Sequence, residues 1–138
     1  MNEAAYRPDA SLVATATDAM SCAYAPYSGF RVGAALATAD GGVFVGCNVE
    51  NSSYPAGICA ERGAVAAAVA HGARSFSVMV VATEAEQPTP PCGICRQVLV
   101  EFAPALEIVS VTSGGASARW NLRDLLPVPF TPDSLAHA

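Results

Sequence analysis

The segment that most constrains the fold is Ser75–Ala82, a short, continuous run of apolar and mostly β-branched residues. Such a run is typical of a strand that is buried on both faces in the middle of a sheet. Helical patterns precede it at 59–71 and follow it at 92–102. Because a helix on each side of a buried strand requires crossover connections, we expect a mixed sheet with helices packed against it.

Four further segments are predicted to be strands. Phe30–Leu36 alternates apolar side chains with others, as a strand does, and Asp40–Gly42 is suited to a hairpin turn into Val43–Cys47. Leu106–Val111 is a fourth strand in chain order, and a glycine turn leads to a fifth at Ala118–Leu122. The sheet is therefore expected to have five strands.

The chain of 138 residues is predicted to be one domain, residues 1–138. A first helix is expected after Asp9, which is suited to cap it. The predicted fold class is α/β, a three-layer α/β/α sandwich with a five-stranded mixed sheet. The two middle helices are expected to begin at the same edge of that sheet.

Composition limits the partners of the chain. Hydrophobic residues make up 52% and charged residues 14%, which excludes a disordered chain. Mean hydropathy is +0.35, yet no apolar run is long enough to span a membrane, so apolar surface is expected between subunits. The net charge of −5, with seven cationic residues that are all arginine, argues against nucleic acid and anionic membranes as partners.

The cysteines are expected to bind metal or to take part in catalysis. Residues 1–9 do not have the basic and then apolar pattern of a signal peptide, so we expect a reducing, cytoplasmic location. In such a compartment five cysteines are poorly explained by disulfides.

Three of the cysteines and one glutamate lie at two predicted helix starts. Cys59-Ala60-Glu61 opens one helix, and Cys92 and Cys95 open the next. Helix N-termini favour thiolates, and three thiolates can hold a tetrahedral zinc ion with its fourth position open. Glu61 is too close to Cys59 in sequence to ligate the same ion readily, but it can handle the proton of a water bound there.

Two simpler interpretations remain open at this point. The C-x-x-C motif alone is also typical of a dithiol redox pair. A structural zinc would need a fourth protein ligand, and the spare candidates are Cys22, Cys47, His71 and His137. None of these is well placed, because His71, for example, lies about 18 Å along the helix from Cys59. A catalytic zinc is therefore favoured.

The motifs resemble those of the small, homotetrameric cytidine deaminases. C-A-E at 59–61 and P-C-G-x-C at 91–95 form the nucleobase deaminase signature with Cys in place of the first His. The likeness covers nearly the whole chain, in order, through the segments Tyr24–Leu36, Gly46–Asn51, Ile58–Arg62, Cys95–Gln97 and Leu125–Pro127.

The resemblance implies a zinc-dependent hydrolase that converts free cytidine and deoxycytidine to uridine and deoxyuridine with release of ammonia. Zinc would be held by Cys59, Cys92 and Cys95, and Glu61 would carry protons between water, N3 and the departing amine. Arg62 would hydrogen-bond the thiolates and restore the acidity of the metal. The family also implies a homotetramer and a place in pyrimidine salvage.

The resemblance further assigns nucleoside binding to Phe30, Asn48, Glu50, Tyr54, Ala60 and Phe130. Asn48 and Glu50 match contacts to the sugar hydroxyls, and Phe130 matches an aromatic residue that reaches the site of a neighbouring subunit. A free nucleoside is expected in preference to a nucleotide, because Glu50 would repel a phosphate and strand alternation would point Arg31 away from Phe30.

Other functions are weighed against this one. A deaminase for a cytosine nucleoside antibiotic such as blasticidin shares the two cysteine motifs, whereas Asn48 and Glu50 favour cytidine. A polynucleotide or tRNA deaminase is disfavoured by the acidic, lysine-free composition. From another class, a non-enzymatic zinc protein or a dithiol redox module would show no activity on any cytosine nucleoside.

Overall fold

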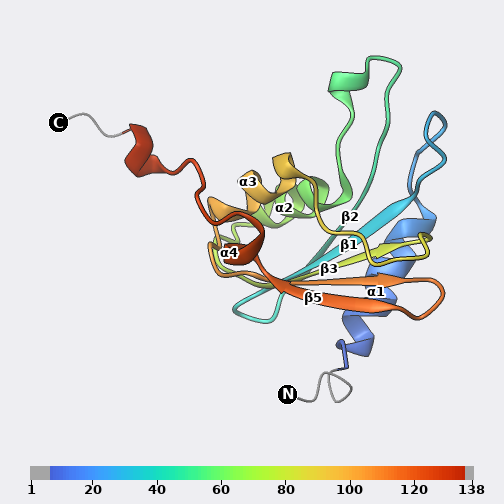
Figure 1. Cartoon of the computed structure of the whole chain (residues 1–138), viewed down its shortest axis with the longest axis horizontal. Coiled ribbons are helices and arrows are strands. Elements are labelled where there is room, and N and C mark those ends of the chain that lie inside the picture. The colour runs from blue at the N-terminus through green and yellow to red at the C-terminus, as the bar shows by residue number, and fades with distance from the viewer. Residues whose placement is uncertain (1–6, 136–138) are drawn as a thin grey trace.

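A five-stranded mixed sheet forms the middle layer of the computed structural model, which describes residues 7–135 (Figure 1). The strands lie in the order β2-β1-β3-β4-β5. β3 and β4 pair in parallel, and every other neighbouring pair is antiparallel. The strand bounds are β1 Val32–Thr38, β2 Val43–Cys47, β3 Phe76–Thr83, β4 Glu107–Thr112 and β5 Ser117–Asn121. The predicted sheet is confirmed.

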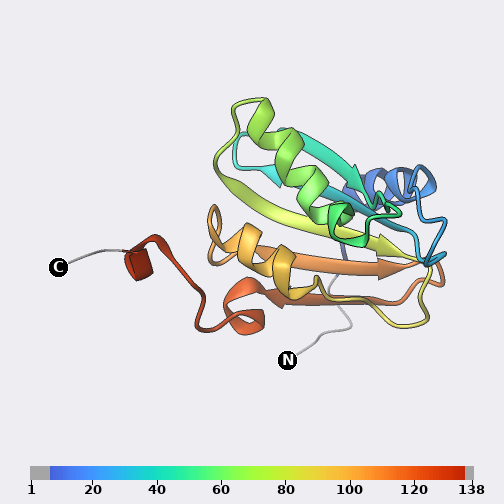
Figure 2. The same ribbon diagram turned by 90° about the horizontal axis from the view of Figure 1, so that it is seen from above.

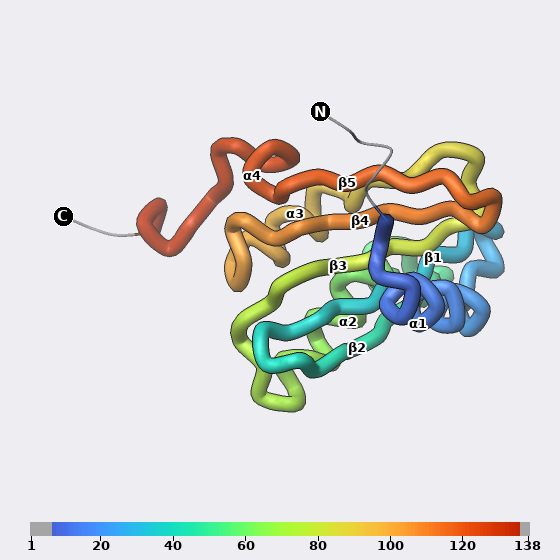
Figure 3. Tube along the Cα trace, turned by 90° about the horizontal axis from the view of Figure 1, so that it is seen from below, coloured from blue at the N-terminus to red at the C-terminus, as the bar shows by residue number. Residues whose placement is uncertain are grey.

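Helices cover both faces of the sheet. α2 (Ala60–Ala70) and α3 (Gly93–Val100) lie side by side on one face (Figure 2), and α1 (Ala10–Ser21) lies on the other (Figure 3). The short helix α4 (Leu122–Leu125) follows β5 directly. This is the three-layer α/β/α arrangement that the sequence predicts. Among the described residues no helix is both long and apolar enough to cross a membrane.

β3 is the buried central strand that the sequence predicts. Met79 and Val81 pack into the core under α2 and α3, whereas Val80 and Ala82 pack into the core under α1. All four side chains are buried. Because successive residues of a strand face opposite sides, the continuous apolar run supplies both cores at once.

The first strand begins two residues later than predicted. Asn48 accepts a hydrogen bond from the Val32 backbone N–H at 2.8 Å and donates one to the Phe30 carbonyl at 2.7 Å. The Asn48 side chain therefore takes the place of a backbone acceptor for the Val32 N–H. Phe30 and Arg31 precede β1. The prediction that strand alternation sets the direction of the Arg31 side chain is therefore wrong, and Arg31 pairs with Glu84.

Gly46 of β2 allows α2 to lie directly on the sheet. A Cβ atom at this glycine would lie 2.2 Å from the Ala60 carbonyl oxygen and 2.5 Å from the Ala64 nitrogen, both backbone atoms of α2. Contacts this short are not possible, so any side chain at Gly46 would displace the start of the helix. That start is where Cys59 and Glu61 are located.

We therefore expect Gly46→Ala to lower the free energy of unfolding by about 1–3 kcal/mol, the usual cost of overpacking. Gly63→Ala is the matched control on the facing helix, because its Cβ would lie 3.5 Å from the Cα of Gly46, an ordinary contact. It should be neutral or stabilise the protein by up to about 1 kcal/mol, since alanine favours helix. Denaturant titration measures both; equal effects would contradict the close packing.

Candidate active site

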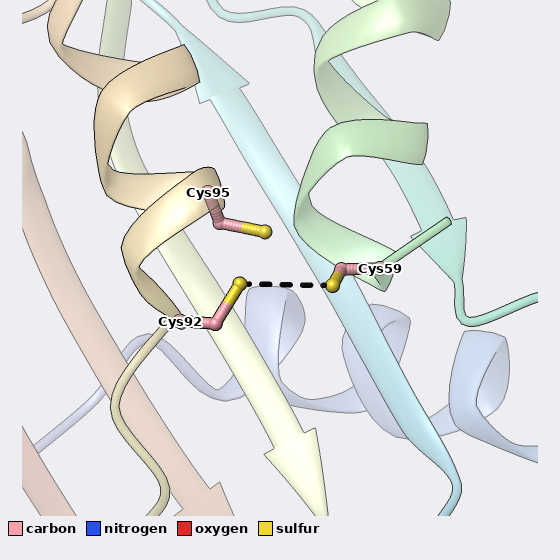
Figure 4. A group of neighbouring side chains, drawn as sticks. All are labelled: Cys59, Cys92 and Cys95. Carbon is pink, nitrogen blue, oxygen red and sulfur yellow. Dashed lines mark hydrogen bonds between the residues drawn. The ribbon is translucent and has the colours of Figure 1, made fainter. Parts of the chain in front are cut away.

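Three cysteine sulfurs converge where α2 and α3 begin. Cys59 and Cys92 are the N-cap residues of the two helices, and Cys95 lies in the first turn of α3. The three Sγ atoms lie within 4.8 Å of one another, and those of Cys59 and Cys92 are 3.8 Å apart. Figure 4 shows the side chains pointing toward a common centre from the two helices.

The cluster has the geometry and chemistry of a zinc site. Zn–S bonds of about 2.3 Å in a tetrahedron place two sulfurs about 3.8 Å apart. Within residues 7–135 no fourth histidine, cysteine or carboxylate joins the group. His71 caps the far end of α2, and its Nδ1 contacts the Ala67 carbonyl; His137 is outside the described residues. The donor set therefore leaves one coordination position for a ligand from outside the protein.

The environment of the cysteines favours thiolate. A hydrogen bond from Cys95 lowers the pKa of Cys59 to about 5, and Arg62 contributes to the same shift through its contact at 3.7 Å. The pKa of Cys95 is raised, because its proton is shared with Cys59 and its side chain is buried. The cluster is thus suited to hold a thiolate, the form of cysteine that binds a metal.

Arg62 is directed at the cluster from the first turn of α2. Its Nη2 donates to Cys59 Sγ, and this contact raises the pKa of the guanidinium further. Its Nε atom is buried and has no hydrogen-bond partner among the described residues. A half-buried cation beside three sulfur atoms offsets part of the charge of their thiolate forms.

Glu61 is a buried carboxyl group beside the sulfurs. Glu61 is 5% exposed. Burial raises the pKa of its carboxyl group to about 7, and the negative charge of the Cys59 thiolate raises it to a smaller extent. Ala60, between Glu61 and Cys59, is fully buried. A carboxyl group whose charged form is disfavoured in this way can both accept and donate a proton near neutral pH.

Glu50 organises the loop that follows α1. Its carboxylate accepts hydrogen bonds from the backbone N–H groups of Tyr27 and Ser28, at 2.9 and 3.0 Å, and from the Ser28 hydroxyl. These bonds lower the pKa of Glu50, and the bond from the Ser28 hydroxyl has the largest effect. Ser28 was not singled out from the sequence, although it lies inside the segment Tyr24–Leu36 that carries the family resemblance.

A cavity of about 360 Å³ opens beside Glu50. Its walls are formed by Tyr27, Ser28, Glu50, Asn51, Tyr54 and Gly57. The rings of Tyr27 and Tyr54 meet edge to face, with centroids 5.9 Å apart. Paired backbone hydrogen bonds between Val49 and Ile58 join the Glu50 segment to the residue that precedes Cys59. The cavity is therefore connected to the cysteine cluster through adjacent backbone.

Phe30 and Phe130 lie outside these two groups. Phe30 is 41% exposed, and its carbonyl oxygen is bound by Asn48. Phe130 is 58% exposed and lies on the C-terminal arm, residues 126–135, which leads away from the sheet (Figure 1). Its carbonyl oxygen accepts a hydrogen bond from Gln97 at 2.7 Å. Phe130 thus lies on a segment that extends from the body of the chain.

Comparison with known proteins agrees with this arrangement. Residues 7–111 match the model of the cytidine and deoxycytidylate deaminase zinc-binding region. The chain belongs to the cytidine and deoxycytidylate deaminase family. The matched region contains all three cysteines of the cluster, so the family and the geometry both identify zinc as the metal.

Individual members of this deaminase family resemble the chain over most of its length. A cytidine deaminase from Sporosarcina psychrophila is 43% identical, over 92% of this chain and 94% of its own. The crystal structure of cytidine deaminase from Burkholderia pseudomallei has a TM-score of 0.86 at 46% identity, covering 90% and 100% of the two chains. The crystal structure of cytidine deaminase from Mycobacterium tuberculosis has a TM-score of 0.76 at 40% identity, and the match covers 87% of this chain and 94% of that one.

Replacing one cysteine of the cluster should abolish metal binding. We expect Cys92→Ala to lose the zinc and to lower thermal stability, because metal binding at such a site is coupled to folding. Cys47→Ala is the control, since this cysteine is half-buried outside the cluster and burial raises the pKa of its thiol. Metal analysis of both purified variants measures the effect, and full zinc content in Cys92→Ala would refute the ligand assignment.

Proposed function

We propose that this chain catalyses the hydrolytic deamination of free cytidine and deoxycytidine, with Cys59, Cys92 and Cys95 as the zinc ligands. The observation that carries the proposal is the cluster of three sulfurs with the buried carboxyl group of Glu61 beside it. A redox dithiol needs neither the third sulfur nor the carboxyl group, and a structural zinc site needs a fourth protein ligand. Relatives named cytidine deaminase support the choice of substrate.

Glu61 is the residue that moves protons in this proposal. Zinc, when bound, supplies a Lewis acid that acidifies a water molecule. Glu61 would take a proton from the water and deliver it to N3 of the cytosine ring while the water oxygen adds to C4. It would then take the remaining proton of that oxygen and pass it to the C4 amine, which leaves as ammonia as the carbonyl of the uracil ring forms. Burial supports this role, because it keeps the two protonation states of the carboxyl group close in free energy. Arg62 offsets the charge of the sulfur ligands.

The nucleoside is proposed to bind between the cysteine cluster and the cavity beside Glu50. In this proposal the Glu50 carboxylate accepts hydrogen bonds from the sugar hydroxyls, and the Asn48 amide accepts from and donates to them. Both side chains are already oriented by their hydrogen bonds with backbone groups of residues 27–32. Phe30 and Tyr54 provide aromatic surface, and Ala60, which has a small side chain, lies beside the catalytic carboxyl group.

We infer that the working form is a homotetramer in which Phe130 completes the site of a neighbouring subunit. Exposed apolar side chains on the edge strand β2 (Val43 and Val45) and on the arm (Val128 and Phe130) support burial between copies. Sedimentation measures the assembly; a fully active monomer at assay concentration would contradict it.

Residues 1–138 are proposed to form one catalytic domain, because two cores share a single sheet. The proposed setting is pyrimidine salvage in the cytoplasm. All five cysteines are free, and a reducing compartment would keep the cluster available for metal.

Glu61→Gln separates metal binding from catalysis. The amide keeps the size of the side chain but cannot carry the proton, so turnover of cytidine should fall about 10²- to 10⁴-fold while zinc content and fold are retained. Glu101→Gln, at the exposed end of α3, is the control and should retain activity. Absorbance change on conversion of cytidine gives the rates. Near-normal turnover of Glu61→Gln would remove Glu61 from the mechanism.

Nucleotides should be poor substrates. Glu50 lines the proposed sugar site, and Arg31, the nearest cation in sequence to Phe30, is paired with Glu84. A phosphate within several ångströms of Glu50 would cost on the order of 1–4 kcal/mol, or roughly 10- to 1000-fold in binding. The values of kcat/KM for cytidine and its 5′-monophosphate measure this difference. Similar values for both would overturn the role of Glu50.

A further inference from the structure

Arg96 makes two side-chain hydrogen bonds that join distant parts of the chain. It follows Cys95 directly in α3, and its side chain is half-buried. Its Nε donates to the Pro91 carbonyl at 2.8 Å, and its Nη1 donates to the Leu125 carbonyl at 2.9 Å. Pro91 is the residue before Cys92, and Leu125 ends α4. A single guanidinium therefore bridges the cysteine loop and the base of the C-terminal arm.

The contact with Pro91 constrains the least enclosed sulfur ligand. Cys95 is buried within a helical turn, whereas Cys92 is exposed and its own side chain caps nothing. The position of Cys92 relative to Cys95 depends on the peptide that joins Pro91 to Cys92. Arg96 holds this peptide through the Pro91 carbonyl, and the Arg96 backbone N–H binds the Cys92 carbonyl at 3.0 Å. Both carbonyls that flank the Cys92 nitrogen and Cα are thus bound by one residue.

A second fixed point lies earlier in the same loop. The Thr89 backbone N–H donates to the Ser110 hydroxyl at 2.9 Å, and Ser110 is fully buried in β4. Ser110 therefore anchors the start of the loop 89–92, and Arg96 anchors its end. The Cys92 side chain caps no backbone group of α3, and its sulfur contacts that of Cys59 at 3.8 Å.

The contact with Leu125 extends this restraint to the arm. The last carbonyls of a helix lack partners within the helix, and an arginine is well suited to bind one. Gln97, the next residue of α3, binds the Phe130 carbonyl within the arm. Arg96 thus binds the residue that precedes the arm and Gln97 binds the arm itself, and of these two side chains Arg96 is the one that also contacts the cysteine loop.

We propose that Arg96 is a positioning residue that fixes Cys92 for metal binding and couples this geometry to the placement of the C-terminal arm. The inference rests on the proposed roles of Cys92 and Cys95 as zinc ligands. Loss of the guanidinium frees the Pro91–Cys92 peptide and the end of α4 together. Groups that orient metal ligands typically change metal affinity 10- to 100-fold when they are removed, and a change of about this size is expected here.

The test measures zinc release from the purified holoprotein into an excess of a colorimetric chelator. Arg96→Ala should release zinc roughly 10- to 100-fold faster than the unaltered protein. Arg96→Lys, which keeps the charge but cannot bind both carbonyls in the fork geometry of a guanidinium, should fall between the two. This conservative variant decides the outcome if Arg96→Ala does not fold.

Two control variants separate positioning from general stability. Arg74→Ala removes a guanidinium that also binds two backbone carbonyls, those of Val69 and Ala73, at the far end of α2. Gln97→Ala removes the other contact between α3 and the arm. Both should release zinc at the unaltered rate. Tryptic cleavage after Arg123, followed by mass spectrometry, should accelerate in the Arg96 variants and not in Arg74→Ala.

The outcomes distinguish this inference from the proposed function. Zinc release that is unchanged in Arg96→Ala and Arg96→Lys, or equally fast in Arg74→Ala, would overturn the positioning role alone. Unaltered protein that binds no zinc would overturn the ligand assignment and, with it, this inference. Faster zinc release with unchanged cleavage after Arg123 would overturn the coupling to the arm.

Discussion

The convergence of two helix N-termini at one sheet edge is the constraint on which the rest of the site depends. β2 and β3 are both antiparallel to β1, so their carboxyl ends lie at the same edge, and α2 and α3 begin there. This topology brings Cys59 to within 3.8 Å of Cys92 although 33 residues separate them in sequence. The positive ends of both helices then favour the thiolates that zinc requires. Gly46 allows one of these helices to lie close enough to the sheet.

Each cation near the site has a specific partner, which fits a chain whose cationic residues are all arginine. Arg62 binds a sulfur, Arg96 binds two backbone carbonyls, and Arg31 pairs with a carboxylate. The planar guanidinium suits the fork of two bonds made by Arg96, which an ammonium group could not reproduce. Positive charge is thus used for positioning and for offsetting thiolate charge, and the acidic Glu50 faces the cavity. This distribution is consistent with an uncharged nucleoside as substrate.

The sequence predicts those features that depend on local pattern. The apolar run Ser75–Ala82 identifies the central strand, and the spacing of the cysteine motifs favours zinc and places the candidate ligands at helix starts. Individual side-chain hydrogen bonds between distant segments could not be predicted. The hydrogen bond from the Val32 N–H to the Asn48 side chain marks the start of β1. Ser28 binds Glu50, which is 22 residues away in sequence, and Arg96 binds Leu125, which is 29 residues away. Both residues lie in motifs that indicate the family, but only the folded chain reveals their partners.

The central claim is that a metal bound by the three cysteines is required for deamination of cytidine. The most direct measurement is to remove metal from the protein with a chelator, titrate zinc back, and follow the loss of cytidine absorbance at each step. The account predicts that turnover is absent without zinc and rises in proportion to zinc until one ion is bound per chain. Stoichiometric zinc binding with no turnover of cytidine, or turnover that persists after zinc has been removed, would contradict it.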